Sequence, residues 1–278
     1  MVGIIIPANI IDIGNIKIII ATHKQHFMPS DDMYLPLHVG KSGKEELGYQ
    51  GDDTGDNISA KNSNFCELTG LYWAWKNLPN DYLGLIHYRR FFSVKSRAER
   101  KKNPLETLYL THEEASQLLS QYDVIVPSKR NYYIETLYSH YANTLHAEHL
   151  DVTREIIAEK CGEFLGSFDA VMKQRGGYMF NMFIMSKELV NDYCSWLFPI
   201  LFELEKRIPA EQYSTFHARF YGRVSELLFN VWLKQYSQSK PLKVKAIPFV
   251  YGEKINWLKK GFAFLSAKFF GKKYEKSF

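Results

Sequence analysis

Residues 82–92 of this chain read YLGLIHYRRFF, an apolar run that ends in His87, Arg89 and Arg90. Leucine, isoleucine and tyrosine in such a run are typical of a buried strand. Two neighbouring guanidinium groups repel each other and lose hydration when they are enclosed, so they need an anionic partner. The stretch therefore predicts a buried strand whose carboxyl end binds an anion. The alternative is a solvated strand end or a structural ion pair.

Two other predicted strands, at residues 16–22 and 123–127, also end in cations. The cations that follow them are His23, Lys24, Lys129 and Arg130. Ligands of open α/β sheets bind outside the carboxyl ends of the strands. If the three strands are parallel, their cations share one edge of the sheet. Because arginine matches phosphate oxygens in a bidentate way, that edge predicts a phosphate-binding crevice.

Helical patterns alternate with the strands, which predicts an α/β domain with a mostly parallel sheet over residues 1–250. Further strands are expected at residues 178–185 and 242–250. Helices are expected at residues 63–78, 111–122, 150–160, 186–204 and 224–236. Asn64 with Glu67, and Thr111 with Glu114, have the spacing of capping boxes.

Length and composition fit one large globular domain. The chain has 278 residues, of which 46% are hydrophobic, and a net charge of +5. That charge fits anionic ligands or an anionic membrane surface and does not by itself indicate nucleic acid.

Cys66, Cys161 and Cys194 lack metal-ligand spacing and are expected to be buried free thiols. The N-terminus lacks the features of a signal peptide and no run is long enough to span a membrane, which predicts a cytoplasmic protein.

The phosphate ligand is not one that a glycine-rich motif would hold. The chain contains no G-x-G-x-x-G, and residues 40–44 (GKSGK) have the wrong spacing for a P-loop. It also contains no Asp-x-Asp, the motif that holds a divalent metal on the diphosphate in many nucleotide-sugar transferases. Arginines at a strand end are able to replace that metal. Asp52, Asp53 and Asp56 are alternative metal ligands, although such residues are more often part of turns.

Three other polar features have both a functional and a structural interpretation. Asn181, inside an apolar run, either orients a sugar hydroxyl or ties down a neighbouring loop. Glu226 is either a general base or a carboxylate stabilised by a helix N-terminus. His146, His149 and Asp151 resemble part of a metal site, but surface or capping roles are more common for such spacing.

The sequence pattern of the C-terminal segment, residues 251–278, differs from that of the α/β domain. Apolar residues recur at helical spacing from Ile255 to Phe269, and seven lysines surround them. The lysines are Lys254, Lys259, Lys260, Lys268, Lys272, Lys273 and Lys276. This pattern predicts a basic amphipathic helix on an anionic bilayer, with a helix docked on the domain or on a partner as the alternative.

Several motifs together resemble one family. They are DNIS at residues 56–59, Asn62, CELTGLYWAWKN at 66–77 and GLIHYRR at 84–90. The family is the bacterial capsular and exopolysaccharide glycosyltransferases long described as domain of unknown function 4422. His23-Lys24, Asn181-Met182-Phe183 and Ser225-Glu226 also look like its motifs, and the resemblance covers roughly residues 16–250.

The resemblance implies a Rossmann-like glycosyltransferase fold of the GT-A kind and transfer from a nucleotide sugar. Some relatives are associated with galactofuranose, which suggests a UDP sugar of that kind as the donor. The acceptor would be a glycan on a polyprenyl diphosphate at the inner face of the plasma membrane, and the transfer would invert the anomeric centre. No nucleic acid partner and no permanently bound cofactor are expected.

In this hypothesis each candidate residue has a role. His87, Arg89 and Arg90 bind the diphosphate and stabilise it as it leaves, and Glu226, or one of the three aspartates, takes the acceptor proton. The residues expected to bind the donor are His23, Lys24, Asp52, Asp53, Asn57, Ser59, Asn62, Tyr88, Lys129, Arg130 and Asn181. The rival hypotheses are a nucleotide-sugar or sugar-phosphate hydrolase or phosphotransferase, and a non-catalytic protein that binds anionic lipid.

Overall fold

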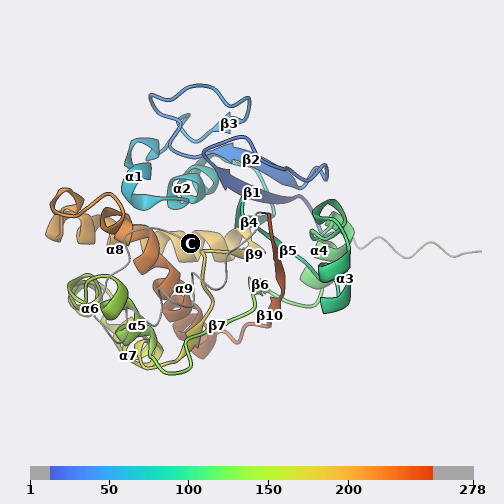
Figure 1. Cartoon of the computed structure of the whole chain (residues 1–278). Coiled ribbons are helices and arrows are strands. Elements are labelled where there is room, and N and C mark those ends of the chain that lie inside the picture. Colours follow the sequence, from blue (N-terminus) through green and yellow to red (C-terminus); the bar gives the residue numbers. More distant parts are fainter. Residues whose placement is uncertain (1–12, 253–278) are drawn as a thin grey trace, which may run out of the picture.

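The computed structural model describes residues 13–252, and its centre is a nine-stranded sheet with strand order β10-β6-β9-β4-β1-β2-β3 (Figure 1). Strands β5 and β11 extend it beside β4. The strands are β1 Ile16–Thr22, β2 Tyr34–His38, β3 Gln50–Gly51, β4 Tyr82–His87, β5 Arg90–Phe92, β6 Val124–Pro127, β9 Phe183–Ser186, β10 Val244–Ile247 and β11 Phe249–Tyr251. A separate two-stranded sheet pairs β7 (Arg130–Asn131) with β8 (Gly176–Gly177).

The direction of the strands places the three cation clusters at one edge. Strand β1 is parallel to β2 and β4, and β6 is parallel to β10. Strand β9 is antiparallel to both β4 and β6, so β6 runs in the same direction as β4. The expected α/β fold with a mostly parallel sheet is confirmed, and the carboxyl ends of β1, β4 and β6 share an edge.

Strand alternation builds a core on each face of the sheet. Ile19 and Leu85 face one buried cluster, while Ile18 and Ile86 face the other. Burial on both faces is typical of strands in a largely parallel sheet. Gly84 lies where β1 and β9 approach β4 most closely, because a Cβ there would come within 2.9 Å of Ile18 Cγ1.

Helices cover both faces of the sheet (Figure 1). They are α1 Asn62–Phe65, α2 Leu68–Asn77, α3 Arg97–Lys102, α4 His112–Leu119, α5 Leu137–Thr144, α6 Glu148–Lys160, α7 Leu165–Met172, α8 Lys187–Arg207 and α9 Phe220–Ser239. Helix α6 packs on α8, and α7 packs on α9, so α5, α6 and α7 form a second layer over these two long helices.

Two predicted elements are wrong, and both errors lie beside the candidate site. The helix expected at 63–78 breaks after α1, because Cys66 has a φ of 55° and the side chain of Asn62 donates to the Cys66 carbonyl at 2.7 Å. The strand expected at 178–185 begins only at Phe183. Phe180 and Asn181 have φ of 75° and 52°, a left-handed turn that no strand contains.

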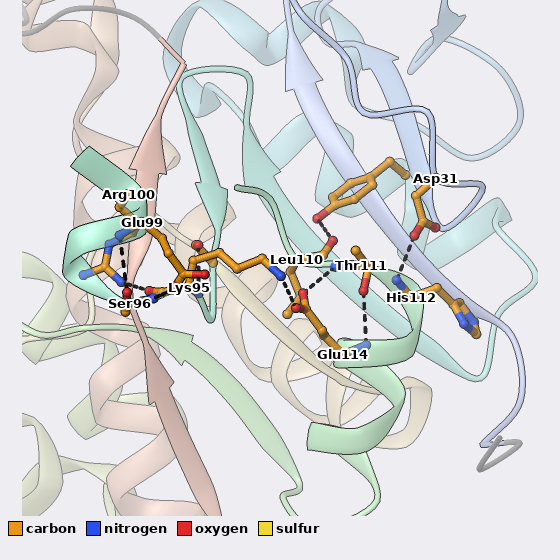
Figure 2. A network of polar contacts seen from close by, with 11 residues as sticks. Asp31, Lys95, Ser96, Glu99, Arg100, Leu110, Thr111, His112 and Glu114 are labelled. Carbon is orange, nitrogen blue, oxygen red and sulfur yellow. Dashed lines mark hydrogen bonds and ion pairs between the residues drawn. The ribbon is translucent and has the colours of Figure 1, made fainter. Parts of the chain in front are cut away.

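A network of helix caps and ion pairs surrounds α3 and α4 (Figure 2). The capping box of Thr111 and Glu114 is confirmed, and Ser96 with Glu99 forms another. Glu114 also pairs with Lys95, so the same carboxylate joins α4 to the segment that leads into α3. Asp31 accepts the backbone N–H of His112 at 2.7 Å, which anchors α4 to the segment before β2.

Three further predictions concern the cysteines, membrane-spanning segments and the C-terminal tail. All three cysteines are free, but only Cys194 is fully buried, whereas Cys66 and Cys161 are partly exposed. Within residues 13–252, no helix is long and apolar enough to cross a bilayer. The predicted tail helix lies outside the described residues.

Candidate active site

A cavity of about 420 Å³ opens at the shared edge of β1, β4 and β6, between the strand ends and helices α5 and α9. It brings together residues from all three predicted cation clusters, which are far apart in sequence. The predicted site residues that line it are His23, His87, Tyr88, Arg89, Arg90, Arg130 and Glu226. The convergence expected from strand direction therefore exists in the structure.

The cavity wall is strongly cationic. Arg89 follows β4, Arg90 begins β5, Arg130 lies in β7, and Arg219 and Arg223 come from the start of α9. These five guanidinium groups face only two carboxylates, those of Glu67 and Glu226, within the same lining. The wall therefore has an excess of positive charge that a bound anion would neutralise.

Two of these arginines have donors ready for a ligand. Nε of Arg90 and NH1 of Arg223 are buried and have no hydrogen-bond partner among residues 13–252. The guanidinium groups instead lie over aromatic rings, Arg90 4.1 Å from the centroid of Phe180 and Arg223 3.9 Å from that of Phe216. Burial lowers the pKa of Arg90, which reflects the cost of enclosing its charge. A buried donor without a partner is expected where a ligand supplies the acceptor.

Two histidines and a tyrosine complete this wall. Burial, followed by the charges of Arg90 and Arg89, holds the pKa of His87 well below its usual value. Burial and the charge of Arg89 lower the pKa of His23 as well. Both rings are therefore neutral near pH 7 and add hydrogen-bonding groups without adding charge. The Oη of Tyr88 is buried and has no hydrogen-bond partner within residues 13–252.

The charges of the two carboxylates, those of Glu67 and Glu226, act on each other. Glu226 Oε2 accepts the backbone N–H of Phe180 at 2.9 Å. Burial and then the charge of Glu67 raise the pKa of Glu226, while Arg90 and Arg130 act in the opposite direction. The Glu67 carboxylate is held by Asn181, whose Nδ2 donates to Oε1 at 2.8 Å.

Asn181 lies beneath the site and does not line the cavity. Its Nδ2 also donates to the carbonyl of Gly222 at 3.0 Å, and its Oδ1 accepts from Ser225 Oγ at 3.0 Å. The amide thus joins the turn before β9 to α9 and to the segment between α1 and α2. Of the two interpretations left open for Asn181, these contacts match the one in which it ties neighbouring segments together.

The other predicted donor-binding residues are placed outside the cavity lining. Asp52 accepts the backbone N–H groups of Gly40 and Lys41 at 2.9 and 3.1 Å and the hydroxyl of Ser59, so it holds a turn. Asn57 accepts the N–H of Ser59 at 3.2 Å. Asn62 donates to Thr69 Oγ1 at 3.1 Å, and Asp53 is exposed.

The two predicted lysines lie over aromatic rings next to the site. Lys24 Nζ lies 5.0 Å from the centroid of Tyr88, and Lys129 Nζ lies 5.0 Å from that of Tyr178. Neither lysine lines the cavity, although the ring of Tyr88 does.

The histidines considered as metal ligands are part of a packed cluster. His149 is buried rather than superficial, and its Nδ1 lies 3.0 Å from the hydroxyl of Tyr141. His146 Nε2 lies 2.8 Å from His217 Nδ1. Within residues 13–252, no group of three or more acidic, histidine or cysteine side chains has the arrangement of a metal site.

Several lining residues were not singled out from the sequence as site residues. Arg219 and Arg223 are four residues apart and Glu226 follows three residues later, which places all three on one face at the start of α9. That spacing is a signal in the sequence, but it does not tell which face meets the sheet edge. Glu67 was predicted only as the capping partner of Asn64, and His140 lies on α5, a helix that was not expected from the sequence.

Comparison with known proteins identifies the family. The model of the family described as "Domain of unknown function (DUF4422)" matches residues 17–238. The chain belongs to the DUF4422 family. All residues that line the cavity fall inside the DUF4422 match. No curated protein matches the chain.

One solved structure is similar to this DUF4422 chain: the apo form of the WbbM bifunctional glycosyltransferase. The two are 32% identical with a TM-score of 0.80, and the match covers 85% of this chain and 45% of that chain. The DUF4422 chain thus spans less than half the length of WbbM. The likeness shows that its α/β architecture is a Rossmann-like glycosyltransferase fold.

Proposed function

We propose that this DUF4422 protein is a glycosyltransferase that moves a hexosyl unit from a UDP sugar to a hydroxyl of a lipid-linked glycan. The observation that carries the proposal is the cluster of five arginines in one cavity at the carboxyl edge of the sheet. The likeness to WbbM, a bifunctional glycosyltransferase, supports the reaction class. Galactofuranose is the first donor sugar to test, and capsule, exopolysaccharide or O-antigen synthesis is the proposed setting.

The charge of the cavity suits the leaving group of such a reaction. In an inverting transfer the acceptor oxygen attacks the anomeric carbon, and the bond from that carbon to the diphosphate breaks. Negative charge then grows on the departing diphosphate. Arg89, Arg90 and Arg223 are fixed before the reaction, so their guanidinium groups stabilise that charge without reorganising. This is the role that a divalent cation has in transferases with Asp-x-Asp.

The donor requirement is tested by incubating the purified full chain with a panel of UDP sugars, with and without a polyprenyl-diphosphate-linked glycan. UDP release that depends on the acceptor, together with an extended glycan, is the expected result. Release of free sugar and UDP at the same rate without acceptor would indicate a hydrolase instead. Binding of anionic lipid without turnover of any donor would indicate a non-catalytic lipid-binding protein.

We expect the basic C-terminal segment to hold the enzyme at an anionic bilayer, where a lipid-linked acceptor would lie. Each lysine near such a surface contributes about 1 kcal/mol to binding. Replacing Lys272, Lys273 and Lys276 by glutamine in the full chain should therefore weaken binding to phosphatidylserine vesicles by about 100-fold. Vesicle flotation measures this, with neutral phosphatidylcholine vesicles as the control. Equal binding of the variant and the wild type would refute the role of these lysines.

A further inference from the structure

A buried histidine–carboxylate pair forms another part of the cavity wall. His140 on α5 lines the cavity, and its Nδ1 lies 2.8 Å from Oε2 of Glu135. Glu135 is only 3% exposed. Its other oxygen, Oε1, accepts from Nδ2 of Asn143 at 2.7 Å. Both carboxylate oxygens are therefore fixed, and one of them is aimed at the histidine ring.

The surrounding structure holds this pair in one orientation. The ring of Tyr132 stacks on His140 with centroids 3.9 Å apart and an interplanar angle of 27°. The next residue, Tyr133, has a φ of 54°, a left-handed conformation that a tyrosine rarely adopts. Arg175 spans this turn, because its carbonyl accepts the N–H of Tyr132 at 2.8 Å and its NH1 donates to the carbonyl of Tyr133 at 3.0 Å. Backbone strain maintained in this way is characteristic of functional sites.

The pair fixes the tautomer of His140. An ionised carboxylate only accepts hydrogen bonds. The Nδ1 of His140 therefore carries the ring proton and donates a hydrogen bond to Glu135. In the neutral ring, the lone pair is then on Nε2. The charged groups that act on His140 are Glu135 and Arg130. Burial lowers the pKa of His140, Arg130 lowers it further, and Glu135 raises it. The ring is therefore neutral, and able to accept a proton, at neutral pH.

We propose that His140 is the general base for the acceptor hydroxyl and that Glu135 is its positioning residue, an inference that rests on the glycosyl transfer proposed above. The acceptor O–H bond breaks and its proton moves to Nε2 of His140. The acceptor oxygen forms a bond to the anomeric carbon, and the electron pair of the breaking C–O bond leaves on the diphosphate. The imidazolium that results is stabilised by the Glu135 carboxylate until it loses the proton to water.

Electrostatics favours His140 over Glu226 in this role. Glu226 already accepts the N–H of Phe180, and its charge offsets Arg90 and Arg130 inside the cationic wall. A carboxylate base would also face the negative diphosphate when the donor is bound, which is repulsive. A neutral imidazole has no such repulsion, and the cation that it forms on accepting the proton is attracted to the diphosphate. Glu226 is thus better suited to balancing the charge of the arginines.

The test begins with the wild type and three full-length variants: His140→Gln, Glu135→Gln and His112→Gln. The last is a matched control, because His112 is exposed at the start of α4 (Figure 2) and does not line the cavity. In His140→Gln, acceptor-dependent turnover should fall by about 10²- to 10⁴-fold, the usual contribution of a general base. Affinity for UDP, measured by calorimetry, should stay within about threefold of wild type, a margin of about 0.6 kcal/mol. His112→Gln should match the wild type in both.

The pH profile separates catalysis from a structural role. In the wild type, kcat/KM for the acceptor should fall at acid pH as His140 becomes protonated. Loss of the Glu135 charge removes the interaction that raises the pKa of His140, so in Glu135→Gln this limb should move to lower pH. A purely structural role of Glu135 would lower the rate without moving the limb. This measurement decides the question even if His140→Gln does not fold.

Three outcomes would overturn the inference. If wild type transfers no sugar from any UDP donor, the proposed function fails and this inference fails with it. If wild type is active and His140→Gln retains turnover within about threefold, only the assignment of the base fails. A fourth variant, Glu226→Gln, tests the competing assignment: if the acid limb is unchanged in Glu135→Gln but lost in Glu226→Gln, the base is Glu226.

Discussion

Replacing Arg89 and Arg90 together by alanine is expected to lower turnover by about 10³-fold or more, because loss of a single preorganised charge-stabilising donor already costs about 10²- to 10³-fold. Affinity for UDP should fall as well, since in the proposed reaction the same groups contact the diphosphate before it leaves. Both residues line the cavity, and Nε of Arg90 has no hydrogen-bond partner within residues 13–252.

Stability should change in the opposite sense to activity. Burial lowers the pKa of Arg90, so the folded state bears a cost for enclosing this cation, and alanine removes it. The melting temperature of the double variant is therefore expected to equal or exceed that of wild type. Arg97→Gln, at an exposed position on α3, is the control and should leave turnover and melting temperature unchanged. Unaltered turnover and UDP affinity in the double variant would show that the diphosphate binds elsewhere.

Asn181→Asp is expected to destabilise the protein by about 3 kcal/mol or more at neutral pH, since it places a buried carboxylate directly against that of Glu67. The amide Nδ2 now donates to Glu67 Oε1 at 2.8 Å and to the carbonyl of Gly222 at 3.0 Å. A carboxylate cannot donate to either when ionised. Protonation of the introduced group restores one donor and removes the repulsion, so the difference from wild type should shrink as pH falls.

Urea unfolding at several pH values measures this effect. Asn103→Asp is a matched control, because Asn103 is exposed at the end of α3, and we expect a change within about 0.5 kcal/mol. A second variant, Asn181→Gly, keeps the left-handed backbone and loses only the side-chain bonds. It should therefore be less damaging than the aspartate at neutral pH. Equal free energies of unfolding for Asn181→Asp and wild type would mean that this network does not hold the turn.

The sequence predicted the parts of the site that depend on local pattern and strand direction. Short apolar runs followed by cations located the ends of β1, β4 and β6, and parallel strands then place those ends together. The Thr111 capping box was predicted for the same reason, because all its partners lie within one helical turn. The direction of β6 relative to β4 follows in the structure from β9, which lies between them.

The remainder depends on contacts that no local pattern records. The break at Cys66 falls in a sequence with good helical spacing, and it is stabilised from outside by Arg219, whose Nε donates to Cys66 Sγ at 3.1 Å. Asp52 lies in a loop whose composition resembles that of a metal-binding loop. Its oxygens nevertheless accept hydrogen bonds from the N–H groups of a nearby turn. Distinguishing these uses of a carboxylate requires knowing which backbone groups lie beside it.

The central position of β9 has a consequence for how the chain folds during synthesis. Strand β9 ends at Ser186 and joins β4, which ends at His87, to β6. A nascent chain leaves the ribosome with its N-terminus first. The edges of β4 and β6 that face each other therefore stay unpaired until β9 has emerged. Open strand edges promote pairing with other chains, and contacts between residues far apart in sequence form slowly. The middle of the sheet thus stays open until β9 is available, and until then its strand edges are the ones that chaperones would protect.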